Sequence, residues 1–265
     1  MYRALHILRA DPNPIFPFDE NEYVNQAKNV ERSQKSLKKE YIALTKSTYY
    51  FFENLNEEKP IYWAGFILGD GCISKNDKNG GAKLVIGLSR NDKSHLEKFA
   101  DDIDYGGEIK DSSVYHKQRD KYDEKTIIRI HRLKICDDLI KHGITQNKSK
   151  ECHLPKTIPD ELMYHFIRGL VDADGCWYVN AKKNMRFLLT CSVYEFLVEL
   201  RAYFANKLGL NPDIKINAKK GCWYLEYAGN KQCKSIYFYL YNKSSVFLDR
   251  KYSICKNHFE KPEVL

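Results

Sequence analysis

The sequence lacks the features that would place it in a membrane, outside the cell or around a structural zinc ion. None of its apolar runs is long enough to cross a bilayer, and it contains no signal peptide and no lipidation motif. Its eight cysteines are scattered without a C-x-x-C pair, and Cys152-His153 has no second half at zinc-like spacing. Most cysteines are therefore interpreted as small core residues of a reducing compartment. We expect an intracellular protein, in the cytoplasm of a bacterium or archaeon, in a phage-infected cell or in an organelle.

Charge is unevenly distributed along the chain. Among the 265 residues, 43 are Lys or Arg and 35 are Asp or Glu, which gives a formal net charge of +8. Residues 1–60 contain equal numbers of basic and acidic side chains, so the positive excess lies in residues 61–265. A basic body is typical of a protein that binds a polyanion, most simply nucleic acid, although an ordinary solvated basic surface gives the same count.

One short pattern occurs twice, from Tyr62 to Cys72 and from Phe166 to Cys176. Each copy contains a glycine, two apolar residues, one variable position, a small residue and then Asp-Gly-Cys. The small residues lie four apart, as Gly65 and Gly69 in one copy and Gly169 and Ala173 in the other. On a helix this spacing puts them on one face, where a missing side chain lets a second backbone come close.

An aspartate ends each copy, Asp70 in the first and Asp174 in the second, and the glycine that follows is suited to a left-handed helix cap. A carboxylate there faces the negative end of the helix dipole. If the two helices pack together, the aspartates approach and repel unless a divalent cation or a proton lies between them. Hard oxygen ligands at an open site indicate Mg²⁺ or a similar ion. A plain helix stop would explain one Asp-Gly, but it explains two matched copies poorly.

These residues resemble the LAGLIDADG homing endonucleases. Trp63 to Gly71 and Ile167 to Gly175 lie over the nine-residue signature, and the second copy is the closer match. The resemblance implies that Asp70 and Asp174 are metal-binding catalytic carboxylates, with Gly69 and Ala173 beside them at the metal. The implied cofactor is Mg²⁺ or another divalent cation such as Mn²⁺. Leu68 stands where the signature has its first acid, so Asp172 has no counterpart and is a weaker candidate for the metal than Asp174.

The order of elements agrees between the two halves, and each is interpreted as helix, hairpin, helix, hairpin, helix. This is the order that the resemblance implies: an α+β fold of two pseudo-symmetric αββαββα units, with saddle-shaped antiparallel sheets and the signature helices packed at the interface. The units are assigned to residues 60–158 and 159–265. After the first signature helix, further helices are predicted at 92–101, 133–142, 162–174, 195–208 and 233–240. Strands are predicted at 83–89, 105–110, 126–131, 177–180, 186–192, 214–218 and 222–227.

Residues 1–59 are predicted to form a helical N-terminal extension. Residues 36–55 fit the tail of a helix-turn-helix in which Thr45 to Thr48 start a recognition helix, or simply a helical extension packed on the body. The zero net charge of this region argues against a major role in DNA affinity.

A lysine follows each signature at a similar distance. Lys148 comes 78 residues after Asp70, and Lys251 comes 77 residues after Asp174. In the family that this chain resembles a catalytic lysine falls at this point of each half, and the resemblance implies that role here. Because the chain is rich in lysine, coincidence remains an alternative, with Lys150 and Arg250 as the neighbours that would take their place.

Polar side chains on the predicted hairpins are candidates for DNA contact, since basic groups there can meet phosphates or read guanine edges. The candidates are Lys83, Arg90, Lys110, Arg129, His131, Lys182, Lys183, Arg186, Lys215, Lys219, Tyr224 and Tyr227.

The leading hypothesis is a monomeric, site-specific endonuclease that cuts double-stranded DNA, because two signatures in one chain complete the site without dimerisation. The alternatives are an intron RNA maturase or a non-catalytic DNA-binding regulator on the same fold. Intact acids at both helix ends argue against a pure binding protein. An intein endonuclease is a third alternative, but no leading Cys or terminal His-Asn is present, so self-splicing is not expected.

Overall fold

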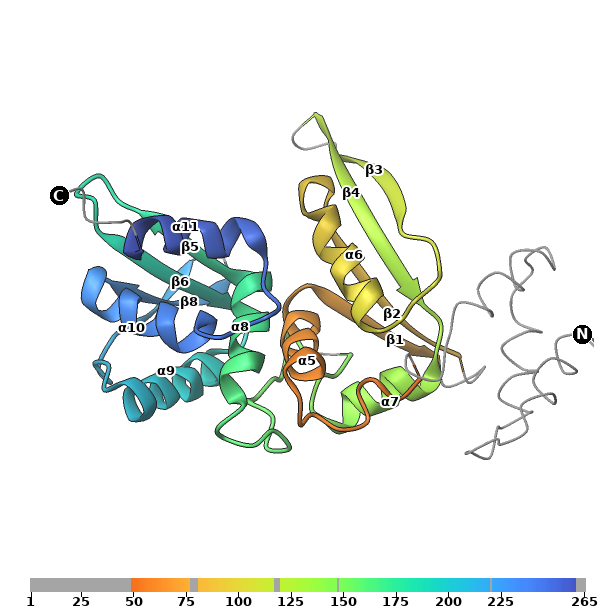
Figure 1. Cartoon of the computed structure of the whole chain (residues 1–265), viewed down its shortest axis with the longest axis horizontal. Helices are drawn as coiled ribbons and strands as arrows, with labels where there is room; N and C mark the ends of the chain where they lie inside the picture. Colours follow the sequence, from red (N-terminus) through yellow and green to blue (C-terminus); the bar gives the residue numbers. More distant parts are fainter. Residues whose placement is uncertain (1–48, 77–80, 117–119, 147, 220, 261–265) are drawn as a thin grey trace, which may run out of the picture.

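The computed structural model describes residues 49–76, 81–116, 120–146, 148–219 and 221–260 (Figure 1). The predicted helix-turn-helix lies outside these residues except for 49–55. Two of the described residues in that stretch, Phe52 and Leu55, are buried against the core. None of the helices in these ranges is long and apolar enough to cross a membrane.

Within the described residues, the first half contains three helices, one 3₁₀ turn and a four-stranded antiparallel sheet in the order β1-β2-β4-β3. Its elements are α5 (Glu58–Asp70), β1 (Gly71–Asn76), β2 (Gly81–Ser89), η1 (Arg90–Asp92), α6 (Lys93–Asp102), β3 (Lys110–His116), β4 (Lys121–Ile130) and α7 (Leu133–Lys141).

The second half repeats this arrangement with a sheet in the order β5-β6-β8-β7 and adds one helix at the end. Its elements are α8 (Met163–Asp174), β5 (Gly175–Val179), β6 (Met185–Cys191), α9 (Tyr194–Leu208), β7 (Ile216–Lys219), β8 (Cys222–Ala228), α10 (Asn230–Tyr241) and α11 (Asp249–Phe259). The predicted α+β fold of two pseudo-symmetric αββαββα units is therefore confirmed.

Helices α5 and α8 lie side by side at the centre of the molecule, between the two sheets (Figure 1). Every residue of α5 from Ile61 to Leu68 is buried, because one side of the helix packs on α8 and the others on its own half. A helix that is apolar on all sides is stable only in such a central position. Each large side chain fully buried there, such as Trp63 or Phe66, contributes about 1.5–3 kcal/mol.

Two local predictions are wrong, and one helix was missed. The strand predicted at 105–110 begins only at Lys110, because Ile103 and Tyr105 turn inward to cap the core after α6. Helix α11 was not predicted. The glycines after the two aspartates are extended rather than left-handed, with φ −81° at Gly71 and −78° at Gly175. They are required for space, since a Cβ on Gly71 would lie 2.7 Å from the Ile67 carbonyl oxygen.

Candidate active site at the paired helix ends

The backbones of α5 and α8 touch through four small residues, Gly65, Gly69, Gly169 and Ala173, which we call the glycine seam. A Cβ on Gly65 would lie 2.0 Å from the carbonyl oxygen of Phe166, and one on Gly169 would lie 1.9 Å from that of Tyr62. Real Cβ atoms do not come so close to backbone, so only glycine fits at these two positions. The spacing of small residues in the sequence thus predicted the contact that the structure contains.

The seam brings the C-terminal ends of the two helices, and with them Asp70 and Asp174, into one site. At this end a Cβ on Gly69 would lie 2.3 Å from the Ala173 Cβ and 3.2 Å from Oδ2 of Asp174. The Asp174 carboxylate therefore reaches across to the last turn of α5. Both aspartates keep exposed surface, so water and ions have access to the paired carboxylates.

The surroundings of the carboxylates favour their protonated forms. Burial by neighbouring protein and then the charge of Asp174 raise the pKa of Asp70 to about 6. Burial also raises the pKa of Asp174 from its ordinary value, against the opposing influence of two lysines. Like charges brought together at the negative ends of two helix dipoles create a demand for a cation.

This coupling predicts a measurable titration. In the metal-free protein, carboxyl ¹³C NMR is expected to show Asp70 titrating near pH 6. In Asp174→Asn the pKa of Asp70 should fall but stay above the ordinary value, because burial is the larger cause. Asp101→Asn, at an exposed position on α6, should leave it unchanged. An identical Asp70 titration in wild type and Asp174→Asn would contradict the close approach of the two acids.

The same shift has a consequence for stability. Folded Asp70 binds its proton more tightly than the unfolded chain, whose ordinary value is 3.8. Protonation of Asp70 therefore stabilises the folded protein. This contribution to the free energy of unfolding is fully present below about pH 4 and is lost as the pH rises through about 6.

Two lysines occupy matching positions behind the carboxylates. Lys148 Nζ donates to the carbonyl oxygens of Ile67, at 3.1 Å, and of Gly69. Lys251 Nζ donates to the equivalent carbonyls of α8, Val171 at 3.0 Å and Ala173 at 2.9 Å. Burial lowers the pKa of both ammonium groups, and the aspartates nearby oppose that shift. The predicted lysines are thus the ones brought to the site.

The two alternative basic residues have other positions. Lys150 is exposed, and Arg250 Nε donates to both carboxylate oxygens of Asp92, at 2.9 and 3.0 Å. Neither takes the place of Lys148 or Lys251 on the helix-end carbonyls.

The oxygen atoms at the helix ends fit a hard divalent cation that keeps some of its coordination positions open for water or substrate. The described residues contain no cluster of three or more His, Cys, Asp and Glu side chains that could enclose a metal. The available groups are the carboxylates of Asp70 and Asp174 and the carbonyl oxygens of Gly69 and Ala173, each of which has a second lone pair beside its lysine bond. Mg²⁺ suits such an incomplete set because it keeps waters and takes substrate oxygens.

The third acid of the two signatures, Asp172, is a buried structural group. It is 1% exposed and accepts hydrogen bonds from Tyr62 Oη at 2.8 Å, Tyr241 Oη at 2.6 Å and the Leu248 amide at 2.8 Å. Its carboxylate thus joins α5, α8, α10 and the start of α11, the helix that carries Lys251. Both oxygens of this carboxylate are therefore occupied by protein hydrogen-bond donors.

Sequence reasoning missed an ion pair that also ties the halves together. Arg168 of α8 is fully buried, and its Nη2 donates to Glu58 of α5 at 2.6 Å. Its Nε and Nη1 donate to the carbonyls of Val246 and Leu240, both at 2.9 Å. An arginine among the apolar residues that begin the second signature helix was the signal available, because such a residue requires buried partners.

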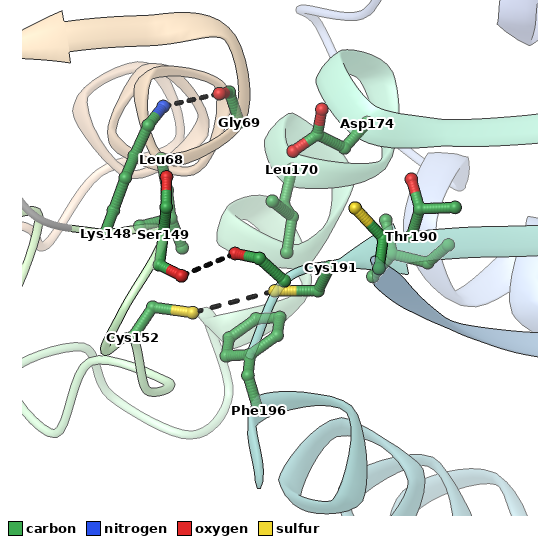
Figure 2. Close-up of a pocket in the computed structure, with 13 residues that line it drawn as sticks. Leu68, Gly69, Lys148, Ser149, Cys152, Leu170, Asp174, Thr190, Cys191 and Phe196 are labelled. Atoms are coloured by element: carbon green, nitrogen blue, oxygen red, sulfur yellow. Dashed lines mark hydrogen bonds between the residues drawn. The ribbon is translucent and has the colours of Figure 1, made fainter. Parts of the chain in front are cut away.

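A cavity of about 290 Å³ lies beside Asp174 and Lys148, at the end of strand β6 (Figure 2). Ser149, Cys152 and Cys191 line it together with the ends of α5 and α8. Sequence reasoning did not find this cavity, because its walls come from segments that are distant along the chain.

Most of the side chains predicted to contact DNA lie on the faces of the sheets that point away from the core, or in their turns. Three of the predicted side chains are half-buried: His131, Arg186 and Tyr224. Those that are exposed to solvent are Lys83, Arg90, Lys110, Arg129, Lys182, Lys183 and Lys215. Three are paired with acids: Arg90 with Glu124 at 2.9 Å, Lys110 with Glu108 at 3.6 Å, and Arg186 with Glu226 at 3.1 Å. Lys219 belongs to β7, and its side chain lies outside what the structure describes.

The prediction is wrong for Tyr227. Its side chain is fully buried against Phe187 and Phe204. Tyr224 and Tyr227 are three residues apart on β8, and side chains alternate between the two faces of a strand, so both cannot point outward. Tyr227 shares the core face with Leu225.

Known proteins are similar to this chain in part of its sequence and in its fold. Residues 161–240 match the family model of the LAGLIDADG-like domain. The solved structure of the homing endonuclease I-WcaI bound to its DNA recognition sequence is 16% identical, with a TM-score of 0.60 over 88% of this chain and 97% of that one. The structure of the LAGLIDADG homing endonuclease I-GzeII in complex with a DNA target is 15% identical, with a TM-score of 0.49 over 76% of this chain and 88% of that one.

A protein of Methanocaldococcus jannaschii described as a probable translation initiation factor IF-2 is 29% identical over 156 residues. That stretch is 57% of this chain but only 11% of the relative, so the match is to a small part of a much longer protein.

Proposed function

From a chain that carries a LAGLIDADG-like domain and has the fold of a homing endonuclease, we propose a site-specific endonuclease that cuts double-stranded DNA. It hydrolyses phosphodiesters as a monomer, with Mg²⁺ or Mn²⁺ held by Asp70 and Asp174. The observation that carries the proposal is the meeting of these two acids at the ends of the packed helices α5 and α8.

Hydrolysis of a phosphodiester requires a nucleophilic water, stabilisation of the developing negative charge and help for the leaving oxygen. A divalent cation at the helix ends would supply Lewis acidity and a more acidic bound water. The carboxylates of Asp70 and Asp174 would hold it, while Lys148 and Lys251 keep positive charge next to the scissile phosphate. Both lysines are fixed by two carbonyls each, so they are oriented before DNA arrives.

The exposed basic side chains on the two sheets support a duplex-binding role, since both sheets flank the paired helix ends (Figure 1). In this proposal the exposed side chains of Lys83 and Arg129 in the first half, and of Lys182 and Lys183 in the second, would contact phosphates or bases. A chain of two non-identical halves is suited to an asymmetric target.

A cleavage screen tests the proposal. Purified protein is incubated with a randomised duplex library in Mg²⁺, and the new ends are sequenced. We expect a single enriched site cut on both strands in Mg²⁺ or Mn²⁺, and no cutting after chelation. A library that is bound but never cut with either metal would contradict the nuclease assignment and favour a binding protein. Stronger binding of structured RNA than of duplex DNA, measured in competition, would favour an intron maturase.

A further inference from the structure

Two cysteines from different parts of the chain meet in the cavity beside the helix ends. Cys152 follows α7 in the segment that carries Lys148, and Cys191 is the last residue of β6. Their Sγ atoms are 3.8 Å apart (Figure 2). We propose that Cys152 and Cys191 form a modification site, at which a hydroperoxide converts the two thiols into a reversible disulfide.

The segment around Cys152 is already held against the second half. Ser192 Oγ donates to the carbonyl oxygen of Ser149 at 2.7 Å, and the Leu154 amide donates to Glu199 at 3.1 Å. These contacts lie on both sides of Cys152 and restrict it to the neighbourhood of β6. Closing the gap from 3.8 Å to a covalent bond of about 2.05 Å therefore needs only a small side-chain movement.

The two thiols differ in the way a peroxide-reactive pair requires. Cys191 is partly exposed and faces the cavity, which gives a small oxidant access. The Cys152 thiol and the Val193 amide, at 3.4 Å, donate to its sulfur and lower its pKa to about 7. Cys152 is 5% exposed, and the shared hydrogen bond and burial raise its pKa. A more acidic, accessible thiol beside a protonated one matches an attacking and a resolving cysteine.

The reaction balances without any other reagent. The Cys191 thiolate attacks the O–O bond of the hydroperoxide, forms a sulfenic acid and releases hydroxide, or alkoxide from an organic peroxide. The Cys152 sulfur then attacks the sulfenic sulfur, the S–S bond forms, and water leaves with the thiol proton. The two sulfurs lose two electrons, which the peroxide bond takes up. A dithiol reverses the change by exchange.

The three other buried cysteines do not have an acidic thiol of this kind. Burial raises the pKa of Cys136 and Cys233 to about 12 and also raises that of Cys255. Cys222 lines the same cavity and is exposed, so it is the cysteine that could pair with Cys191 in place of Cys152.

The disulfide would fix the segment that begins at Lys148, four residues before Cys152, onto the strand end beside Asp174. The oxidised chain should therefore be more resistant to denaturation, because a loop of 39 residues is closed in the unfolded state. This inference concerns the thiols alone and does not depend on the proposed nuclease activity.

The test is oxidation of the full chain with hydrogen peroxide, followed by alkylation of remaining thiols and peptide mapping without reductant. We expect a 152–191 linkage, a mass loss of two hydrogens, a rise in the urea midpoint and full reversal by dithiothreitol. Cys152→Ser should lose the linkage and accumulate a sulfenic acid at Cys191 that dimedone traps. Cys191→Ser should lose the linkage and leave Cys152 reduced.

The matched control is Cys222→Ser, which should form the disulfide as the wild type does. Three results would overturn the proposal: Cys191 linked to Cys222, Cys152 and Cys191 both alkylated after surface thiols have oxidised, or sulfenic acid at Cys152 in Cys191→Ser. Because the mapping is done on wild-type protein, it remains decisive if a variant folds poorly.

Discussion

Asp70→Asn and Asp174→Asn are each expected to reduce double-strand cleavage by at least about a hundred- to a thousandfold, while DNA affinity changes little. Asparagine keeps the size of aspartate but removes the charge that would hold a divalent cation at the helix ends. Each acid stands in the same site as the other, so loss of either should stop cutting of both strands. The measurement is a plasmid digest that separates nicked from linear product, with a parallel gel-shift titration.

Asp101→Asn is the matched control, because it removes one exposed carboxylate on α6, away from the paired ends. It should cleave and bind as the wild type does. Linear product formed at the wild-type rate by Asp70→Asn or Asp174→Asn would rule out the assigned role. A fall in binding as large as the fall in cleavage would indicate loss of the DNA surface rather than of chemistry.

Gly169→Ala is expected to lower the free energy of unfolding by about 3 kcal/mol. The new Cβ would lie 1.9 Å from the Tyr62 carbonyl oxygen and 2.7 Å from the Phe66 nitrogen, so the two helix backbones must separate. Separation also moves Asp174 away from Asp70, and the pKa of Asp70 should fall. Urea denaturation measures the first effect and carboxyl NMR the second.

Gly81→Ala is the control for this change, since no atom lies within 4 Å of a Cβ built there. It should alter the free energy of unfolding by less than about 0.5 kcal/mol. Equal stabilities for Gly169→Ala and Gly81→Ala would mean that α5 and α8 do not depend on close backbone contact.

The repeated signature contained enough information to predict both central helices, their contact face and the pairing of Asp70 with Asp174. Small residues four apart define a helix face by local geometry alone, and duplication shows that the face is used twice. The same regularity placed Lys148 and Lys251, because equal spacing in two repeats predicts equal positions in two copies of one fold.

The ends of the strands and the direction of their side chains were predicted less well. In short strands both depend on contacts with other parts of the fold. Tyr227 was expected outside, although alternation from the apolar Leu225 already placed it inside. The strand expected at 105–110 begins at its last residue, since Tyr105 packs into the core instead.

The sequence alone determined the twofold repeat, the helix-hairpin-helix-hairpin-helix order within each unit and the residues that end each signature helix, because these depend on local periodicity and on glycine's missing side chain. Only the tertiary structure decided which acids remain open and which are buried. Asp172 is enclosed by Tyr62, Tyr241 and Leu248, whereas Asp70 and Asp174 stay accessible. The tertiary structure also decided the burial of Arg168 with Glu58 and the contact between Cys152 and Cys191. These partners are far apart along the chain, and only tertiary packing brings them within bonding distance.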